Sequence, residues 1–336
     1  DTVTPDVACN YAPGTFGELG GNITGLLAAE KGNTTPFSLE ADTAPEFYVT
    51  GDPSAGSPVV RKLERDVSGL TADNPYAGGT QNITNFIADP VEEGILHMVN
   101  ADPARTPTFA VFARPDYFLF NGGASCSGSC VAVNNGFAWD HGDYAAEINT
   151  NFVGFAGPGV RHRGLDGPAP QDGPNSAGPD SGQLTVAESH TKGTWVDETD
   201  IRPTLMYLTG LRDDYTQDGR VISQILTHRT DALRGRDVTA LGACYKQLNS
   251  SVGQFAAAKL IASTKAVESS TPGDALFTSV NARLFALEKA RDALAGQIKD
   301  ELNAAAFGDV PVRGAQFQIQ ACQALIGEAG QLAQAS

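Results

Sequence analysis

The amino-acid composition changes near residue 233, and this change constrains the fold more than any other feature of the sequence. Residues 1 to about 60 are rich in Gly, Pro, Thr and Asn, whereas Ala, Leu, Gln, Lys and Glu dominate beyond residue 233. Apolar residues in this later part recur at helical spacing. The predicted helices span about 252–268, 275–306 and 313–334. We therefore expect an all-helical domain over 233–336, separate in character from residues 1–232.

Short apolar runs before residue 233 are typical of buried strands. The predicted strands are 108–113 and 151–156, both bounded by Pro or Gly, and 46–50. Segments with helical apolar spacing alternate with these runs. The predicted helices are a short one within 21–29, then 58–66 and 82–99, and one with Asp200 as N-cap that ends at Gly210. This alternation indicates an α/β layer fold, with an ordered surface loop or lid over 157–193.

The net charge of −16 excludes some classes of function. Acidic residues are scattered along the chain, and such a field repels polyanions. We therefore expect no nucleic-acid-binding module, although a bound divalent metal can reverse the potential inside a pocket and admit a phosphate ester. The apolar runs are too interrupted to span a bilayer, so no membrane span is expected. The first residues show no signal-peptide pattern, which indicates either a mature N-terminus or a cut through a longer protein.

Five cysteines lack the paired spacing of a zinc knuckle. Cys126 and Cys130 can close a small loop, while Cys244 and Cys322 flank a helical stretch and can tie its ends together. Such pairing predicts an oxidising compartment and a secreted protein. Cys9 is then left over, which suits a partner cysteine before residue 1. The alternative is a cytosolic protein with five unpaired, buried thiols.

Only five histidines can contribute to a metal site, and His141 is the strongest candidate. It lies in a polar loop before the predicted strand 151–156, and the following glycine allows close approach to an ion. Asp140 or Asp143 can orient the imidazole through its second nitrogen. The alternative is an ordinary hydrogen-bonded loop histidine. His97 lies on the apolar side of a predicted helix, which favours a structural role.

Several segments appear in an order that resembles one known family. They are Trp139–Asp143, Glu147–Asn149, Gly157–Val160, Trp195–Thr204, Gly210–Tyr215 and Asp218–Arg220. Their order and spacing resemble the closing segment of alkaline phosphatase superfamily hydrolases, especially the phosphodiesterase-like members. The upstream segments Ala101–Thr108 and Pro115–Phe118 also resemble members of that group, so the resemblance covers most of residues 1–230. It implies that residues 1–232 are the C-terminal portion of an alkaline-phosphatase-like α/β/α sandwich, followed by the helical region 233–336.

The resemblance also implies a phosphoric ester hydrolase with two zinc ions, acting on a small-molecule phosphate ester. Asp and His side chains hold the zinc ions in that family, and a Ser or Thr attacks phosphorus. His141 corresponds to the last zinc ligand, whereas Glu198 stands where relatives have a His. The nucleophile and the earlier ligands have no counterpart between Asp1 and Trp139, so we expect them upstream of Asp1 and expect the isolated chain to be inactive.

The alternative function is non-catalytic. A secreted surface or interaction protein can keep this scaffold without the chemistry, because a fold does not guarantee an activity.

Overall fold

The computed structural model describes residues 17–135, 141–144, 146–149, 151, 153–162, 196–212 and 214–335. They form a mixed α/β structure with a helical C-terminal region. The chain divides into two compact units. The first contains the described residues up to Pro90 and from Asp102 to Asn149, and the second contains Val91–Ala101 and the described residues from 151 onward. The domain boundary after residue 232 divides the chain differently and stays a prediction.

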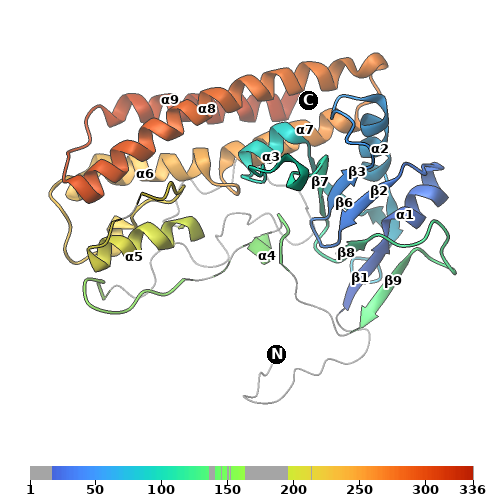
Figure 1. The fold of residues 1–336 in the computed structure, drawn as a ribbon, viewed down its shortest axis with the longest axis horizontal. Coiled ribbons are helices and arrows are strands. Elements are labelled where there is room, and N and C mark those ends of the chain that lie inside the picture. Colours follow the sequence, from blue (N-terminus) through green and yellow to red (C-terminus); the bar gives the residue numbers. More distant parts are fainter. Residues whose placement is uncertain are drawn as a thin grey trace, which may run out of the picture. The chain divides into compact units, whose positions relative to one another are not determined.

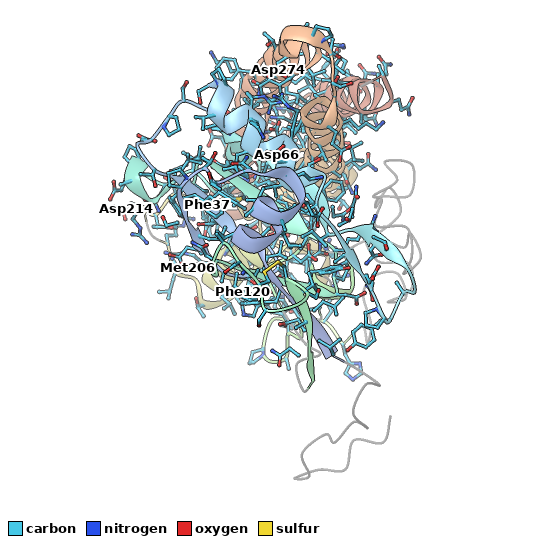
Figure 2. All side chains as sticks on the ribbon, turned by 90° about the vertical axis from the view of Figure 1, so that its right-hand side faces the viewer. Phe37, Asp66, Phe120, Met206, Asp214 and Asp274 are labelled. Carbon is cyan, nitrogen blue, oxygen red and sulfur yellow. A yellow bond between two sulfur atoms is a disulfide. The ribbon has the colours of Figure 1, made fainter. Side chains whose placement is uncertain are left out.

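The first unit is built around an antiparallel sheet with strand order β2-β3-β7-β6 (Figure 1). The strands are β2 (Phe37–Glu40), β3 (Glu46–Val49), β6 (Thr84–Ala88) and β7 (Phe109–Ala113). Every residue of β7 is buried, and the predicted strands 46–50 and 108–113 are confirmed. Phe47 stacks on Phe109 with ring centroids 4.5 Å apart. Phe37, labelled in Figure 2, covers Phe47 from β2 at 4.9 Å.

A second, smaller sheet in this unit has the order β8-β1-β9. Its strands are β1 (Gly17–Asn22), β8 (Tyr117–Phe120) and β9 (Val131–Asn135). β1 runs parallel to β8 and antiparallel to β9. A β carbon at Gly21 would lie 2.8 Å from Leu119 Cδ2, so the glycine permits this close strand packing. A two-stranded ribbon, β4 (Thr71–Asp73) with β5 (Thr80–Asn82), completes the strands of this unit that the structure describes.

Two helices in the first unit begin where the sequence predicts them. β1 leads into α1 (Ile23–Leu26), which continues as a π-helical segment to Lys31. α2 (Pro58–Ser68) starts after Ser57, whose hydroxyl accepts from the Val60 N–H at 3.4 Å, and Pro58 occupies the first turn. The predicted helix 58–66 is confirmed. A further short helix, α4, spans Ala146–Asn149.

Two predictions before residue 160 are wrong. The predicted helix 82–99 is instead β6 followed by α3 (Pro90–Ile95). Pro90 cannot donate a backbone hydrogen bond inside a helix, and residues 84–88 gain theirs by pairing with β7. The predicted strand 151–156 does not form at the positions of this span that the structure describes, since residues 153–156 are irregular and Val153 is 40% exposed. The predicted lid 157–193 lies almost entirely outside the described residues.

The second unit is mainly helical, and α6 to α9 pack against one another (Figure 1). Its longer helices are α5 (Ile201–Thr209), α6 (Arg236–Asn249), α7 (Gln254–Glu268), α8 (Ala275–Gly308) and α9 (Ala315–Ala335). The three helices predicted from residue 252 onward are confirmed as α7, α8 and α9. α7 is buried along most of its length, and α8 contributes Leu284, Ile298 and Leu302 to the core. No helix among the described residues is long and apolar enough to cross a bilayer.

Both predicted cysteine pairs lie at disulfide distance. Cys126 and Cys130 close a loop between β8 and β9, and Cys244 of α6 joins Cys322 of α9. The second disulfide fastens two helices that are distant in sequence, as the spacing predicted.

Candidate functional site

His141 lies in the first unit, on a short segment that hydrogen bonding and a buried tyrosine hold in place. Its imidazole is exposed, and its backbone carbonyl accepts a hydrogen bond of 2.7 Å from Thr43 Oγ1. Three residues later, Tyr144 is 4% exposed and meets Phe86 and Phe112 edge-on, at 5.8 and 5.5 Å between ring centroids. Burial raises the pKa of Tyr144 far above its ordinary value, so the hydroxyl stays neutral. The tyrosine thus ties the segment to β6 and β7 and leaves the histidine at the surface.

Asp42 borders the same segment, although sequence analysis did not identify it. Its Oδ2 lies 3.1 Å from the position that a β carbon of Gly142 would take. Its Oδ1 accepts from the Thr43 N–H at 2.8 Å, and its backbone bridges to Leu119. Gly142 has φ +84°, a conformation that side chains disfavour, so a glycine is required where the chain passes this carboxylate. The Asp42 carboxylate therefore lies beside the short segment that carries the exposed His141 imidazole.

Of the two carboxylates predicted to orient the His141 imidazole, the structure describes Asp143 and not Asp140. Asp143 is 6% exposed, and its carboxylate accepts from the Tyr144 N–H, so it supports the local turn. Asp140 lies outside the described residues. A role for either residue in orienting the His141 imidazole stays a prediction.

The residues around His141 provide few ligands for a two-zinc site. Such a site needs several nitrogen and oxygen ligands around each ion. Among the residues that the structure describes, no three His, Cys, Asp or Glu side chains gather as metal ligands. His141 and Asp42 by themselves do not form a two-zinc site.

No family model, curated protein or solved structure matches this chain. The resemblance to the alkaline phosphatase superfamily therefore rests on the quoted segments alone.

Two of those segments meet in the second unit. The Asp200 carboxylate accepts from the Arg220 N–H at 2.8 Å and lies 3.8 Å from the Arg220 Nε. Thr204 Oγ1 donates to the Asp200 carbonyl and accepts from the Ile222 N–H. Burial raises the pKa of the Asp200 carboxyl, and the Arg220 charge opposes that rise. These residues brace α5 against the segment 219–222, which is a structural role.

Two other contacts in this unit join a segment of the resemblance to residues outside it. The Gly157–Val160 turn pairs with the chain near Leu226, through hydrogen bonds from Arg161 N to Ile225 O at 2.7 Å and from Thr227 N to Gly159 O at 2.8 Å. Glu198 is exposed, and its carboxylate accepts from Asn151 Nδ2 at 2.7 Å. The carboxylate at this position is therefore engaged with a neighbouring side chain.

His97 borders a cavity of about 120 Å³ in the second unit. Its Nε2 lies 2.9 Å from the Asn249 carbonyl and its Nδ1 lies 3.8 Å from an Asp218 carboxylate oxygen. These contacts hold a histidine whose φ is +60°. His97 is exposed and follows the end of α3, so its predicted place on the apolar side of a helix is wrong. His162 and His228 are exposed, and His190 lies outside the described residues.

A larger cavity of about 310 Å³ lies between α5, the segment 214–217 and α8. Met206 and Asp214, both labelled in Figure 2, are on its wall together with Phe307. Arg212 and Lys299 face it as cations, and Asp214 and Asp300 as anions, so its lining has no net charge. This balance does not select an anionic phosphate ester.

Proposed function

We propose that this chain belongs to a zinc-dependent phosphoric ester hydrolase of the phosphatase or phosphodiesterase kind and carries only part of the active site. The observation that supports the proposal is the exposed His141, held by Thr43 and anchored through Tyr144, on a segment that passes the Asp42 carboxylate. In the proposal His141 supplies a nitrogen ligand to zinc and Asp42 supplies an oxygen ligand. Zinc accepts both kinds of ligand.

The remaining parts of the active site belong, in this proposal, to residues outside those that the structure describes. They include the nucleophile and most of the ligands of the two zinc ions. The first unit and the start of the second would then be the C-terminal portion of an alkaline-phosphatase-like sandwich. The two disulfides support secretion, because disulfides persist mainly in oxidising compartments.

A second candidate is a non-catalytic, secreted surface or interaction protein on the same scaffold. Glu198 favours it, because this residue replaces a histidine of the resembled family and its carboxylate is engaged by Asn151. A site that has lost one ligand and gained a hydrogen bond in its place is expected in a protein that no longer binds zinc.

The test compares the complete gene product with its His141→Ala variant. Zinc content, thermal unfolding and hydrolysis of p-nitrophenyl phosphate and bis-p-nitrophenyl phosphate are measured on each preparation. Loss of a metal ligand is expected to lower the rate by roughly a hundredfold or more and to lower zinc content. The melting temperature should be unchanged, since the side chain is exposed.

His228→Ala is the matched control, because His228 is also exposed but lies in the other unit. It should leave zinc content and rate unchanged. Full zinc occupancy and near-normal turnover in His141→Ala would contradict the proposal. A complete gene product with neither zinc nor activity would favour the non-catalytic candidate.

A further inference from the structure

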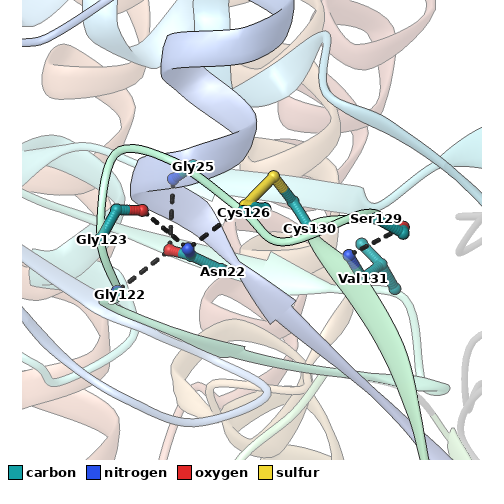
Figure 3. Close-up of a disulfide and its surroundings, with 8 residues drawn as sticks. All are labelled: Asn22, Gly25, Gly122, Gly123, Cys126, Ser129, Cys130 and Val131. Atoms are coloured by element: carbon teal, nitrogen blue, oxygen red, sulfur yellow. Dashed lines mark hydrogen bonds between the residues drawn. A yellow bond between two sulfur atoms is a disulfide. The ribbon is translucent and has the colours of Figure 1, made fainter.

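The Cys126–Cys130 disulfide is held by one side chain in a way that the other disulfide is not. Figure 3 shows Asn22 at the centre of its surroundings. The Asn22 Nδ2 donates to the Gly123 carbonyl at 2.8 Å and to Cys126 Sγ at 3.5 Å. Its Oδ1 accepts from the N–H groups of Gly25 and Gly122, at 3.2 and 3.0 Å. The amide thus uses both of its donors and both of its acceptor positions.

These hydrogen bonds orient the Asn22 amide so that its Nδ2 donates to Cys126 Sγ. Asn22 is 9% exposed, and the two N–H groups on its oxygen polarise the amide, which strengthens its own N–H groups as donors. The sulfurs also rest on the chain at Gly25, where a β carbon would lie 2.3 Å from Cys126 Sγ and 2.9 Å from Cys130 Sγ. A disulfide sulfur is a weak acceptor, whereas a thiolate is a strong one. The hydrogen bond to Cys126 therefore favours its reduced, ionised form.

The two disulfides also differ in exposure and in the loops they close. Cys126 and Cys130 are both partly exposed, while Cys244 is 8% exposed and Cys322 is completely buried. The first pair is separated by 4 positions and the second by 78. A short loop constrains the unfolded chain less than a long one, so opening the first disulfide costs less folding free energy.

We propose that Cys126–Cys130 is a site of reversible thiol–disulfide exchange, with Cys126 as the leaving thiolate and small dithiols as the class of reductant. One thiolate of the dithiol attacks Cys130 Sγ, a new sulfur–sulfur bond forms, and the Cys126–Cys130 bond breaks. The bonding electron pair leaves on Cys126 Sγ, where Asn22 Nδ2 donates to it. The second thiolate of the reagent then displaces Cys130, so the reagent becomes a cyclic disulfide and the protein gains two electrons.

The first experiment uses the wild-type chain, with Cys244–Cys322 as an internal control. Native protein is treated with dithiothreitol, free thiols are alkylated, and peptides are quantified by mass spectrometry over time. Reduction of Cys126–Cys130 is expected to be at least tenfold faster than reduction of Cys244–Cys322. Equal rates for the two disulfides would overturn the proposal.

The second experiment separates the role of Asn22 from simple exposure. In chain reduced only at Cys126 and Cys130, the pH dependence of iodoacetamide alkylation gives a midpoint for each thiol. Cys126 is expected to titrate below Cys130 and below the ordinary thiol value of about 8.5. Equal midpoints would overturn the proposal, and this comparison within one wild-type chain needs no variant to fold.

Asn22→Asp replaces the donor toward Cys126 with a carboxylate oxygen and should raise the Cys126 midpoint. Ser129→Ala is the matched loop control. It removes the hydrogen bond that Ser129 Oγ accepts from the Val131 N–H at 3.1 Å, and it leaves the contact between Asn22 and the sulfur in place. The control should keep the wild-type midpoint. A midpoint that is the same in Asn22→Asp and wild type would remove Asn22 from the proposal and overturn it.

Discussion

Asp200 and Arg220 are joined twice although they lie 20 positions apart, through the Arg220 backbone N–H and through its guanidinium. Both side chains are nearly inaccessible, at 1% and 7% exposure. The two residues come from separate segments whose sequence indicates only their order along the chain. Their contact joins the two segments, because one carries the N-cap of α5 and the other supplies a counter-charge to it.

Removal of the Arg220 charge should therefore destabilise the second unit. Arg220→Met removes the main counter-charge of the buried Asp200 carboxylate and leaves only the weaker effect of Lys246. We expect a loss of about 3 kcal/mol in the free energy of unfolding. The double variant Asp200→Asn with Arg220→Met should lose less than the sum of the single variants, because no uncompensated charge remains. Urea denaturation of the four proteins measures this. Additive losses would show that the two side chains do not interact energetically.

A pair of glycine variants tests the close approach beside Asp200. A β carbon at Gly219 would lie 1.9 Å from the Thr199 carbonyl oxygen, whereas at Gly296 of α8 it would meet nothing within 4 Å. Gly219→Ala should destabilise by about 3 kcal/mol, because the obstacle is backbone. Gly296→Ala should stabilise by about 0.5–1 kcal/mol, since alanine favours the helix interior. Thermal unfolding of both variants measures these changes. A Gly219→Ala variant with the wild-type melting temperature would show that the chain at residue 219 moves away from Thr199 easily.

Glu64 should make the stability of the first unit depend on pH. Burial raises its pKa to about 8, the buried Asp89 adds to the rise, and Arg61 opposes it through an ion pair. The folded state therefore holds a proton that the unfolded chain releases above its ordinary pKa of about 4.5. The contribution of Glu64 to the free energy of unfolding is fully present below pH 4.5 and is lost as the pH rises toward about 8. At about 1.4 kcal/mol for each pKa unit, the loss amounts to a few kcal/mol.

Glu64→Gln should flatten that dependence, because the amide carries no proton that titrates. Urea unfolding at pH 5, 6, 7 and 8 compares wild type, Glu64→Gln and the exposed control Glu40→Gln. The control should keep the wild-type slope. The same slope in Glu64→Gln as in wild type would show that Glu64 does not titrate in this interval.

The two disulfides should differ in their contribution to stability. Replacing Cys244 and Cys322 by Ser releases a loop with a separation of 78 positions, and chain entropy predicts a loss of about 4 kcal/mol. The same change at Cys126 and Cys130 releases a separation of 4 and should cost about 2 kcal/mol. Calorimetry on the two double variants tests the ranking. A larger loss at Cys126 and Cys130 would reverse it.

Local features of the sequence were enough to predict the C-terminal helices and both disulfides. Apolar periodicity is a property of near neighbours, so α7, α8 and α9 are visible without knowledge of what they pack against. The cysteine pairs were visible because one closes a very short loop and the other flanks a helical stretch.

Only the tertiary structure decided the contacts between distant residues. Residues 84–88 carry apolar spacing that also suits a helix, and pairing with β7 makes them a strand. Asp42 borders the His141 segment because the chain at Asp42 bridges to Leu119 and Thr43 binds the His141 carbonyl. Such contacts depend on strand register and on packing across about a hundred positions of sequence, which nearest-neighbour patterns do not encode.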